Sequence, residues 1–422
     1  MASSVTQKEA TPVRFGVAGL GGYAQSIADV LLESNTKLGP QVVQFIAAGD
    51  PAHASFGERA KLLKSRGVEI LPSYDAVLAR KDIDAVWLPV PIHLHRPFTE
   101  QAFATGRPVM CEKPPAGCIE DLDAMARASA AAKLPLLFGY QDIYDPSMLV
   151  LKRKLLAGVI GKVTSLSIAA AWPRDSVYYA RNDWAGKLRR GDHWVMDSII
   201  TNALAHPVNL ALYLLGNTNA SAAAPVELEG ELYRVNPIEN FDTVALRAKL
   251  DTGSTLLVAM SHATRNEWGP EFTIVGNNGS ARMVRGSIQI LKPDGTVIET
   301  IERSKSNRVD MVRLTCAHFR GVPSEQLDGA VATPAVVRPH LVLCNALSET
   351  VPVRIVDEAH VDSATIRPGG KLRFIRDIEP MLRECASKLK LFSELGAAWA
   401  SAPRKSKGSL LDYTHFAGPA SA

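Results

Sequence analysis

Residues 13–24 read VRFGVAGLGGYA, and this stretch decides the fold of the first part of the chain. The short apolar run over residues 13–18 predicts a buried strand, and the apolar spacing of residues 27–32 predicts a helix. The pattern G-x-G-x-x-A lies between them. Its first glycine allows a tight turn, its second lets a pyrophosphate approach the backbone, and its alanine lets helix and strand pack closely. The stretch therefore predicts a dinucleotide-binding turn, with expected contacts from Gly19, Gly21, Gly22, Tyr23 and Ala24.

A second expected strand, Val42 to Ala48, is followed by Gly49, Asp50 and a proline. An acid at this strand end accepts hydrogen bonds from the adenosine ribose and repels a 2′-phosphate, so Asp50 favours NAD over NADP. The alternative interpretation is an ordinary turn aspartate before a proline. Asp50 comes later than the usual ~20 residues after the glycines. We attribute the extra length to a loop over residues 35–40.

Strands and helices continue to alternate after Asp50. The expected elements are a helix over 74–79, a strand over 85–90, a helix over 97–105, a strand over 109–111, a helix over 119–132 and a strand over 134–138. This alternation predicts a doubly wound parallel sheet, whose ligand site lies outside the carboxyl ends of its strands. Glu112 and Lys113 follow such an end. The alternative is a solvated turn, because lysine and glutamate are rarely buried.

The composition bounds the class of protein. The chain has 422 residues, enough for two domains, a formal net charge of +4 and no block of five or six like charges, so we expect no nucleic-acid partner. Five scattered cysteines form no C-x-x-C pair, and we expect neither a disulfide framework nor a metal site. No apolar run approaches membrane-spanning length and no secretory signal opens the chain, which favours a cytoplasmic protein that does not bind membranes.

Six segments together carry a resemblance to a known family. They are GVAGLGGYA, AAGDPA, DAVWLPVPIHLH, GRPVMCEKPPA, GYQDIYDPSMLVLKRKLLAGVIGKV and FTIVGNNGSARM, in this order. From Val13 to Ser348 the chain resembles the glucose-fructose oxidoreductase, inositol dehydrogenase and MocA (Gfo/Idh/MocA) family of NAD(P)-dependent oxidoreductases. The resemblance implies an α/β Rossmann domain followed by an α+β domain with a large open, mostly antiparallel sheet.

The second part of the chain agrees with that expectation by its own pattern. Strand-like runs occur over 163–170, 244–250, 254–261, 272–275 and 287–291. Asn277-Asn278-Gly279 and Pro293-Asp294-Gly295 are hairpin signals, and Ala335 to Ser348 predicts a helix.

These patterns divide the chain into four parts: a disordered N-terminus over 1–12, a Rossmann domain over 13–145, a substrate and oligomerisation domain over 146–366, and a C-terminal segment over 367–422. We expect a helix from Phe374 to Leu395 in the last part. Its tail is expected to cover either the site or a neighbouring subunit.

The resemblance also implies roles for single residues. In the family, the lysine of the EKP segment reaches both the nicotinamide ribose and the substrate hydroxyl, which assigns a catalytic role to Lys113. Glu112 is expected to pair with Lys113 or to contact the ribose. Further cofactor contacts are expected from Val90, Pro91 and His95. The implied cofactor is NAD, with NADP as the alternative.

The second catalytic pair of the family is an aspartate and a histidine four residues apart on one helix face. An ungapped alignment places Asn202 and His206 there. Asparagine can orient a hydroxyl but cannot accept a proton from it. An alignment with an insertion instead places Asp197 at the first position; otherwise Asp197 or Ser198 serves the helix N-terminus. Pro207 predicts a kink or a late start of the regular helix. The alternative for His206 is a packed core residue.

A loop between the first strand of the second sheet and the His206 helix is expected to bind substrate. Aromatic rings stack on sugar faces, and arginine or asparagine side chains donate to hydroxyls or a carboxylate. The candidates are Trp172, Arg174, Tyr179, Arg181, Asn182 and Trp184. The alternative is a surface loop held by its own aromatic residues.

The leading functional hypothesis is an NAD-dependent dehydrogenase that oxidises a secondary hydroxyl of a sugar, cyclitol or related polyol. The alternatives are a glycosidase that retains NAD and acts through transient oxidation, and a non-catalytic sensor of dinucleotide or sugar. We also expect a homodimer or homotetramer, because a large apolar sheet face is rarely left in water.

Overall fold

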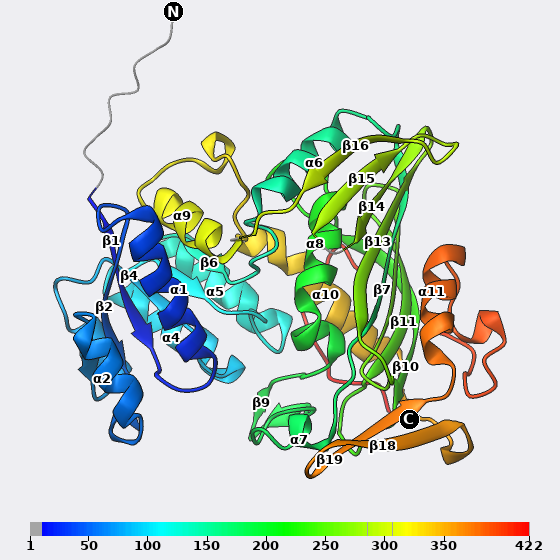
Figure 1. Cartoon of the computed structure of the whole chain (residues 1–422), viewed down its shortest axis with the longest axis horizontal. Coiled ribbons are helices and arrows are strands. Elements are labelled where there is room, and N and C mark those ends of the chain that lie inside the picture. The colour runs from blue at the N-terminus through cyan, green and yellow to red at the C-terminus, as the bar shows by residue number, and fades with distance from the viewer. Residues whose placement is uncertain (1–10, 285, 306, 422) are drawn as a thin grey trace, which may run out of the picture. The chain divides into compact units, whose positions relative to one another are not determined.

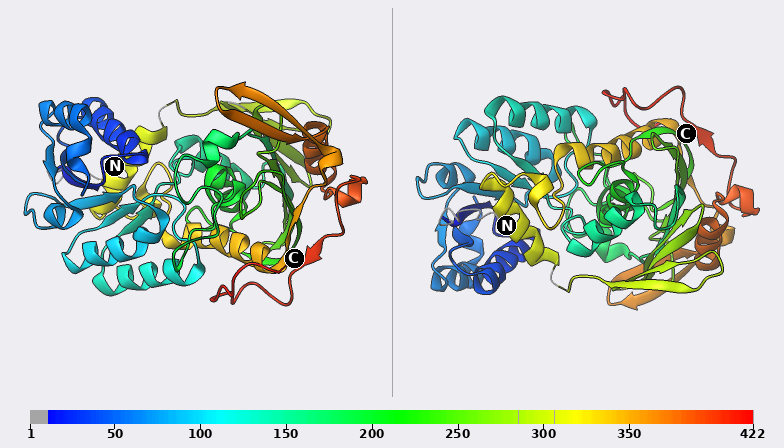
Figure 2. Two further views of the ribbon diagram at one scale, coloured as in Figure 1. Left: turned by 90° about the horizontal axis from the view of Figure 1, so that it is seen from below. Right: turned by 90° about the horizontal axis from the view of Figure 1, so that it is seen from above.

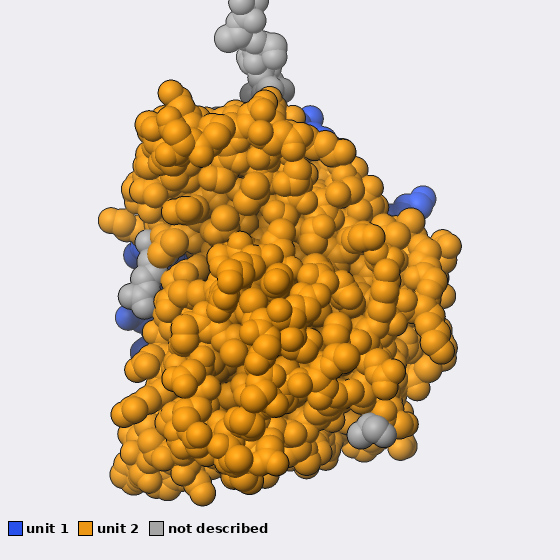
Figure 3. Space-filling model, turned by 90° about the vertical axis from the view of Figure 1, so that its right-hand side faces the viewer, with its two compact units in different colours: residues 1–112, 124–145, 306–333 blue, residues 113–123, 146–305, 334–422 orange. Residues whose placement is uncertain are grey.

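The computed structural model describes residues 11–284, 286–305 and 307–421, which form two compact units. The first unit contains the residues up to 112 together with 124–145 and 306–333, and the second contains 113–123, 146–305 and the residues from 334 onwards (Figure 3). Of the expected disordered N-terminus, residues 1–10 lie outside the described part of the chain. No helix in the described ranges is both long and apolar enough to cross a bilayer.

The chain passes between the units at several points, one of which is the expected boundary between residues 145 and 146. The described residues of the segment 307–333, which we expected in the second domain, pack in the first unit. Its helix α9 (Asn307–Phe319) lies against α1 (Tyr23–Leu38).

A parallel sheet of six strands in the order β3-β2-β1-β4-β5-β6 forms the centre of the first unit (Figure 1). Its strands are β1 (Val13–Ala18), β2 (Val43–Gly49), β3 (Glu69–Leu71), β4 (Ala85–Leu88), β5 (Val109–Cys111) and β6 (Leu136–Phe138). All four residues of β4 are buried, as expected for a parallel strand covered on both faces. The predicted doubly wound Rossmann sheet is confirmed.

The helices of the first unit follow its strands. Besides α1 and α9 they are α2 (Gly57–Ser65), α3 (Tyr74–Leu78), α4 (His95–Ala104) and most of α5 (Ile119–Ala132), with short 3-10 turns η1 (His53–Ser55), η2 (Ile92–Leu94) and η4 (Ser324–Gln326). The residues of α5 up to Asp123 belong to the second unit. The predicted loop over residues 35–40 is wrong for residues 35–38, because α1 continues to Leu38. Gly39, with a φ of 88°, ends it.

The second unit is built on a sheet of ten strands, in the order β16-β15-β14-β13-β7-β12-β11-β10-β17, with β20 also paired to β10. Most pairs are antiparallel, and β7 with β12 and β10 with β17 are parallel. The strands are β7 (Val163–Ala171), β10 (Pro225–Arg234), β11 (Thr243–Leu250), β12 (Thr255–Ser261), β13 (Trp268–Gly276), β14 (Gly279–Val284), β15 (Ser287–Leu291), β16 (Val297–Glu302), β17 (Val353–Ile355) and β20 (Arg404–Lys405). The expected large, mostly antiparallel sheet is confirmed.

Helices cover both faces of this sheet. On one face lie α8 (Ala205–Leu215) and α10 (Pro334–Thr350), and on the other lies α11 (Ile378–Lys388) (Figures 1 and 2). Ten of the eleven residues of α8 are buried, so it is the central helix of the unit. The other short elements are α6 (Pro146–Leu156), α7 (Ser176–Tyr179), η3 (Ile199–Ala203), η5 (Glu358–His360), η6 (Ser393–Leu395) and the two-stranded pairs β8 (Arg189–Arg190) with β9 (His193–Trp194) and β18 (Val361–Arg367) with β19 (Gly370–Ile375).

The predicted helix from Phe374 to Leu395 is wrong in its extent. Phe374 belongs to strand β19, and α11 covers only Ile378–Lys388. Left-handed backbone conformations at Asp377 (φ 58°) and Leu389 (φ 53°) bound the helix on its two sides. Because such conformations interrupt a right-handed helix, the apolar spacing of the sequence continues past the actual helix ends.

Candidate active site

The glycine turn of the first unit has the geometry of a phosphate-binding loop. Gly19 has a φ of 102°, and its N–H donates to the Gly49 carbonyl at 2.7 Å. Gly22, with a φ of 54°, stands directly before α1, and no side chain caps the first turn of that helix. A Cβ at Gly21 would approach the Phe56 ring to 2.8 Å. The helix N–H groups are therefore presented without a competing cap, as binding of a pyrophosphate requires.

Asp50 is fixed at the end of β2 beside this turn. One carboxylate oxygen accepts from the Leu20 N–H at 2.8 Å, and the other accepts from the Ala52 N–H at 2.8 Å. Because a carboxylate offers about four lone pairs, these two bonds leave room for ribose hydroxyls. The turn and the carboxylate together have the geometry expected of a dinucleotide site, and the preference for NAD over NADP stays a prediction.

Replacing Asp50 by serine is expected to lower the preference for NAD over NADP by at least about tenfold, because the charge that repels a 2′-phosphate is removed. Titration of wild type and variant with each dinucleotide, followed by protein fluorescence, measures the ratio of the two dissociation constants. Asp75→Ser, at an exposed position of the same unit, is the control. Tighter binding of NADP than of NAD by the wild type would contradict the role given to Asp50.

Two further expected cofactor residues lie after β4. The ring of His95 is buried, and its Nε2 is 2.9 Å from the carbonyl oxygen of Val90. This bond fixes the backbone next to Pro91. His95 is therefore placed to hold the turn in shape, and the contact of Val90 and Pro91 with a cofactor stays a prediction.

Glu112, the last residue of the first unit before the chain crosses over, is buried after β5. Its Oε1 accepts from the indole Nε1–H of Trp87 at 3.0 Å. A buried carboxylate requires such partners. Its contact with the ribose stays a prediction.

Lys113, the first residue on the other side of this crossing, belongs to the second unit. Its Nζ donates to the backbone oxygen of Asn202 at 2.7 Å and to the side-chain Oδ1 of Asn202 at 2.9 Å. The Nδ2 of Asn202 donates in turn to Oδ1 of Asp197 at 2.6 Å. The three side chains form a continuous hydrogen-bonded chain, Lys113–Asn202–Asp197. Lys113 and Asn202 are 89 positions apart in the sequence.

The backbone around Asn202 explains why the sequence allows two alignments, one with Asn202 and one with Asp197 at the position of the family aspartate. Residues Ile199–Ala203 form a π-helical turn, η3, and the regular helix α8 begins only at Ala205. A π-helical turn is the form that an insertion takes within a helix, and it occurs often at functional sites. Asn202 contacts Lys113 directly, and Asp197 does so through Asn202. The late helix start predicted from Pro207 is confirmed.

Ser198 is the cap of this turn. Its Oγ accepts from the Thr201 N–H at 3.3 Å, and the Thr201 Oγ1 accepts from the Ser198 N–H at 2.9 Å. This reciprocal pair leaves the Asp197 side chain for other partners. Ser198 thus caps the π-helical turn, whereas the regular helix α8 begins without a side-chain cap.

Asp197 is buried, and burial raises the pKa of its carboxyl group above the ordinary value. The N–H of Gly186, 2.6 Å from Oδ2, the amide of Asn202 and the charge of Arg181 all act in the opposite direction. The nearest guanidinium nitrogen of Arg181 is 3.9 Å from Oδ2. Asp197 is thus a buried acid held by donors on both oxygens.

The C-terminal tail packs against residues next to Asp197 in the second unit. Phe416 is buried in a small cluster with Cys118 and Met196, the residue before Asp197, and its ring lies 5.1 Å from that of Trp194. The Phe416 N–H donates to Glu120 at 2.9 Å. The tail was expected to cover either the site or a neighbouring subunit. The structure shows that it contacts residues of its own unit.

His206 is the second residue of α8 and is half-buried. Because Leu204, with a φ of −113°, interrupts the helix between Asn202 and His206, the four-residue spacing does not place them on one regular helix face, and that part of the prediction is wrong. The catalytic role of His206 stays a prediction.

Two histidines that the sequence did not single out lie close by in the same unit. His262 has its Nδ1 2.7 Å from the Trp172 carbonyl oxygen, and burial together with the charges of Arg174 and Arg181 lowers its pKa to about 3. His340 has its Nε2 2.9 Å from the Ile200 carbonyl oxygen, and burial lowers its pKa to about 4. Both rings are neutral at pH 7. No periodic pattern marks a single buried histidine, which is why the sequence missed them.

The expected substrate loop is gathered around the ring of Tyr178. The guanidinium carbon of Arg174 lies 4.8 Å from the centre of this ring, and that of Arg181 lies 3.8 Å from it. Trp172 and Trp184 flank the pair, each 5.4 Å from one guanidinium. The loop is thus an alternation of cationic and aromatic groups.

Asn182 serves this loop internally. Its Oδ1 accepts from the N–H groups of Trp184 at 3.2 Å and Ala185 at 2.8 Å. Such an arrangement is an ordinary side-chain turn. The structure therefore explains Asn182 without a substrate, and a substrate contact of Asn182 stays a prediction.

A small cavity adjoins the loop. It is lined by Tyr178, Tyr179, Asp197, Ser198, Ile199, Ile238, Phe241 and His262. Its volume of about 10 Å³ is close to what one water molecule requires. The hydroxyl of Tyr179, one of the lining residues, is buried with no hydrogen-bond partner among the described residues.

Two family models match the chain. The model described as "Oxidoreductase family, NAD-binding Rossmann fold" matches residues 13–140, and that of the "GFO/IDH/MocA C-terminal domain" matches residues 148–282. In the part of the chain that the structure describes, no group of three His, Cys, Asp or Glu residues is placed to hold a metal ion.

Curated relatives carry the names of dehydrogenases and reductases. A dTDP-3,4-didehydro-2,6-dideoxy-alpha-D-glucose 3-reductase of Streptomyces antibioticus is 27% identical over 72% of this chain and 83% of its own length. The reductase of the same name from Streptomyces violaceoruber is matched over 65% of its length. An inositol 2-dehydrogenase of Rhizobium meliloti is 22% identical over 67% of this chain and 80% of its own.

Solved structures share the fold. KijD10, a 3-ketoreductase from Actinomadura kijaniata crystallised with NADP and TDP-benzene, superposes with a TM-score of 0.64 at 18% identity. The match covers 82% of this chain and 100% of KijD10.

Proposed function

Because this chain belongs to the GFO/IDH/MocA family of NAD(P)-dependent oxidoreductases, we propose that it transfers a hydride between NAD and a secondary carbinol carbon of a sugar, cyclitol or related polyol. The observation that supports this proposal is the chain Lys113–Asn202–Asp197, which fixes the ammonium group of Lys113, a residue that follows the carboxyl end of strand β5 in the sequence. Such strand ends are where ligands bind in doubly wound folds. The names of the curated relatives support a sugar or cyclitol as the substrate class.

The bound nicotinamide supplies the hydride acceptor or donor, and the residues of the chain manage the oxygen. In the oxidation direction the substrate carbon loses a hydride and its hydroxyl loses a proton, which leaves a ketone. Lys113 donates to that oxygen and stabilises the negative charge that develops there. Asn202 accepts from Lys113 through two oxygens and so fixes the direction of the ammonium group.

Asp197 fixes Asn202. Because Nδ2 of Asn202 donates to the carboxylate, its Oδ1 has to face Lys113. Asn202 cannot accept a proton from substrate, so the base is another residue. We assign that role to His206.

His206→Asn is expected to lower turnover by about 10²-fold or more, the usual range for a lost general base. The measurement is kcat per folded molecule, with the melting temperature recorded in parallel and His360→Asn as a control at a 3-10 turn of the same unit. A lower melting temperature with unchanged kcat would remove His206 from the mechanism and leave it a packing residue.

Arg174 and Arg181 point to a substrate that carries an acidic group. Among the described residues Arg174 has no ion pair. The ion pair of Arg181 is with Asp197, whose Oδ2 is 3.9 Å from a guanidinium nitrogen. Asp197 also accepts from Gly186 and Asn202. Partly buried charges need a partner. A carboxylate or phosphate on the sugar supplies it, while the rings of Trp172, Tyr179 and Trp184 pack against the sugar face.

The test incubates purified protein with NAD and a panel of neutral sugars, cyclitols and sugar acids, and follows the absorbance of NADH. We expect oxidation, with sugar acids favoured. Release of an aglycone without NADH from glycosides in the same panel would favour the glycosidase, and specific sugar binding with neither reaction would favour the sensor.

A further inference from the structure

The residue before Asp197 has an unusual backbone conformation. Met196 has a φ of 48°, in the left-handed region. A residue other than glycine keeps such a conformation only where its surroundings hold it, and residues of this kind gather at functional sites. The N–H groups of Met196 and Asp197 donate to the carbonyl oxygens of Leu188 at 3.0 Å and Lys187 at 2.9 Å. The direction in which the Asp197 side chain points therefore depends on how Met196 is held.

The side chain of Met196 lies in a small apolar cluster that the C-terminal tail completes. Its members Cys118, Met196 and Phe416 are more than nine-tenths buried, with Leu188 and Trp194 packed at its edge. The rings of Phe416 and Trp194 meet edge to face. Of the three buried members Phe416 has the largest side chain, so its removal would leave a cavity beside Met196.

The same cluster also contacts the segment that carries Lys113. Cys118, a member of the cluster, lies five residues after Lys113. Gly117 packs so closely on Trp194 that a Cβ at this position would come within 2.1 Å of the Trp194 carbonyl oxygen. Both ends of the hydrogen-bonded chain that begins at Lys113 are thus continuous with backbone segments that meet at this cluster.

Hydrogen bonds fix the tail on two helices of its own unit. On α5, Oε1 of Glu120 accepts from the Phe416 N–H at 2.9 Å and lies 2.6 Å from Nδ1 of His415. On α10, Oε2 of Glu349 accepts from the Tyr413 hydroxyl at 2.7 Å. Bonds to carboxylates are among the stronger hydrogen bonds of proteins. They set the register of the tail, so that Phe416 meets the cluster in one position.

We propose that Phe416 is a positioning residue: its ring keeps Met196 in the left-handed conformation, which directs the Asp197 carboxylate to Asn202 and thereby fixes the ammonium group of Lys113. Phe416 takes no part in the chemistry itself, and its effect on turnover rests on the proposed function. It lies beyond residue 282, where the second family model ends. The matched family domains therefore do not supply this role.

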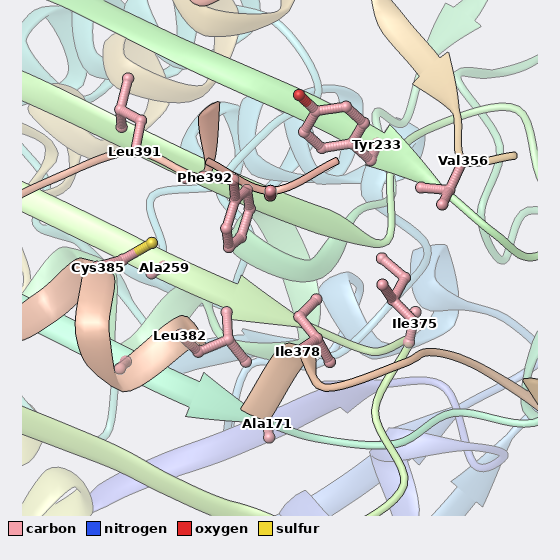
Figure 4. Packing of buried hydrophobic residues seen from close by; sticks show 14 of the residues in the cluster. Ala171, Tyr233, Ala259, Val356, Ile375, Ile378, Leu382, Cys385, Leu391 and Phe392 are labelled. Carbon is pink, nitrogen blue, oxygen red and sulfur yellow. The ribbon is translucent and has the colours of Figure 1, made fainter. Parts of the chain in front are cut away.

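Phe416→Ala in the full chain tests the proposal. Turnover per folded molecule is expected to fall by about tenfold, because a misplaced group costs rate even when every reacting group is present, while the dissociation constant for NAD is unchanged. Phe416→Leu retains an apolar side chain in the cluster and is expected to restore most of the turnover. The matched control is Phe392→Ala, which removes a buried ring from the separate cluster under α11 (Figure 4). This control should lower the melting temperature only.

A double-mutant cycle shows whether Phe416 acts through Asp197. In an Asp197→Ala background, Phe416→Ala is expected to lower turnover no further, because the carboxylate that the ring positions is already absent. An undiminished loss in that background would overturn the proposal. Turnover of Phe416→Ala equal to that of the Phe392→Ala control would overturn it as well.

Amide hydrogen exchange of residues 196–204, measured by mass spectrometry without substrate, separates this proposal from the proposed function. Phe416→Ala is expected to speed exchange in this segment at least about threefold, because the segment then opens more often, and Phe392→Ala is not. Faster exchange in a protein that oxidises nothing in the panel would count against the proposed substrate class and support the positioning of Asp197 by the tail. Unchanged exchange in Phe416→Ala would overturn the positioning role, whatever the turnover.

Discussion

Lys113→Ala is expected to lower kcat by about 10²–10⁴-fold while NAD still binds. The loss follows from removal of the donor that stabilises the developing alkoxide, and general acid–base and oxyanion contributions are typically of this size. The dinucleotide is expected to stay bound because the glycine turn and Asp50 belong to the other unit and have their own bonds. Steady-state kinetics with the best substrate of the panel, together with fluorescence titration of NAD, separates the two effects.

Two further variants sharpen this experiment. Lys113→Met retains the length of the side chain without its charge and should be as inactive as the alanine variant. Lys371→Ala removes an exposed lysine from the same unit and should behave as wild type. A Lys113→Ala enzyme with kcat within about threefold of wild type would remove Lys113 from the chemistry, because general acid–base groups contribute far more.

Asp197→Ala is expected to lower both stability and turnover. Two N–H donors, from Gly186 and from Asn202, lose their acceptor, and each unsatisfied buried group costs about 1–3 kcal/mol. Turnover per folded molecule should fall by about 10²-fold, since Asn202 is then free to rotate and Lys113 loses its fixed partner. The dissociation constant for NAD should not change.

A matched control separates positioning from folding. Asp242 is another fully buried aspartate of the second unit, and it accepts from the N–H groups of Val235 at 3.0 Å and Asn236 at 2.9 Å. Asp242→Asn should lower the melting temperature and leave turnover per folded molecule unchanged, and Asp197→Asn should restore part of the activity lost in Asp197→Ala. Equal turnover in Asp197→Ala and Asp242→Asn, measured per folded molecule, would show that Asp197 is structural only.

The sequence predicts the first unit well because its signals are local. Residues 13–24 contain strand, turn and helix start within twelve positions, and Asp50 follows the neighbouring strand. The bond of Leu20 with Asp50 follows from the side-by-side pairing of β1 and β2, and the bond of Ala52 with Asp50 is local to the turn after β2. A periodic pattern and a handful of turn residues determine such an arrangement.

The hydrogen-bonded chain Lys113–Asn202–Asp197 could be predicted only in part. The resemblance pointed to Lys113 and Asn202, but their contact spans 89 residues and no local pattern reports it. The π-helical turn was not visible either, because it shifts the spacing of apolar residues by one position and looks like an imperfect α-helix. For that reason Asp197 and Asn202 looked like alternatives, whereas the structure bonds one to the other.

Strand β10 shows that alternating charged residues do not always indicate a solvent-exposed strand face. Its glutamates at 227, 229 and 231 suggest a solvated strand, and the sequence did not single it out. Glu231 is nevertheless buried, because Ser393, a residue 162 positions further along the chain, donates to it. A pattern of charge predicts solvent exposure only where no distant segment supplies the partners.

Residues 356–400 pack apolar side chains against the large sheet, and this packing affects how the protein responds to dilution. A segment tethered to its own sheet is present there at an effective concentration of the order of millimolar. A second copy at micromolar protein would face a roughly 10³-fold disadvantage in concentration, equivalent to about 4 kcal/mol. An oligomer that covers the same surface between subunits loses stability as it is diluted. The packing of residues 356–400 on the sheet is therefore not weakened by dilution.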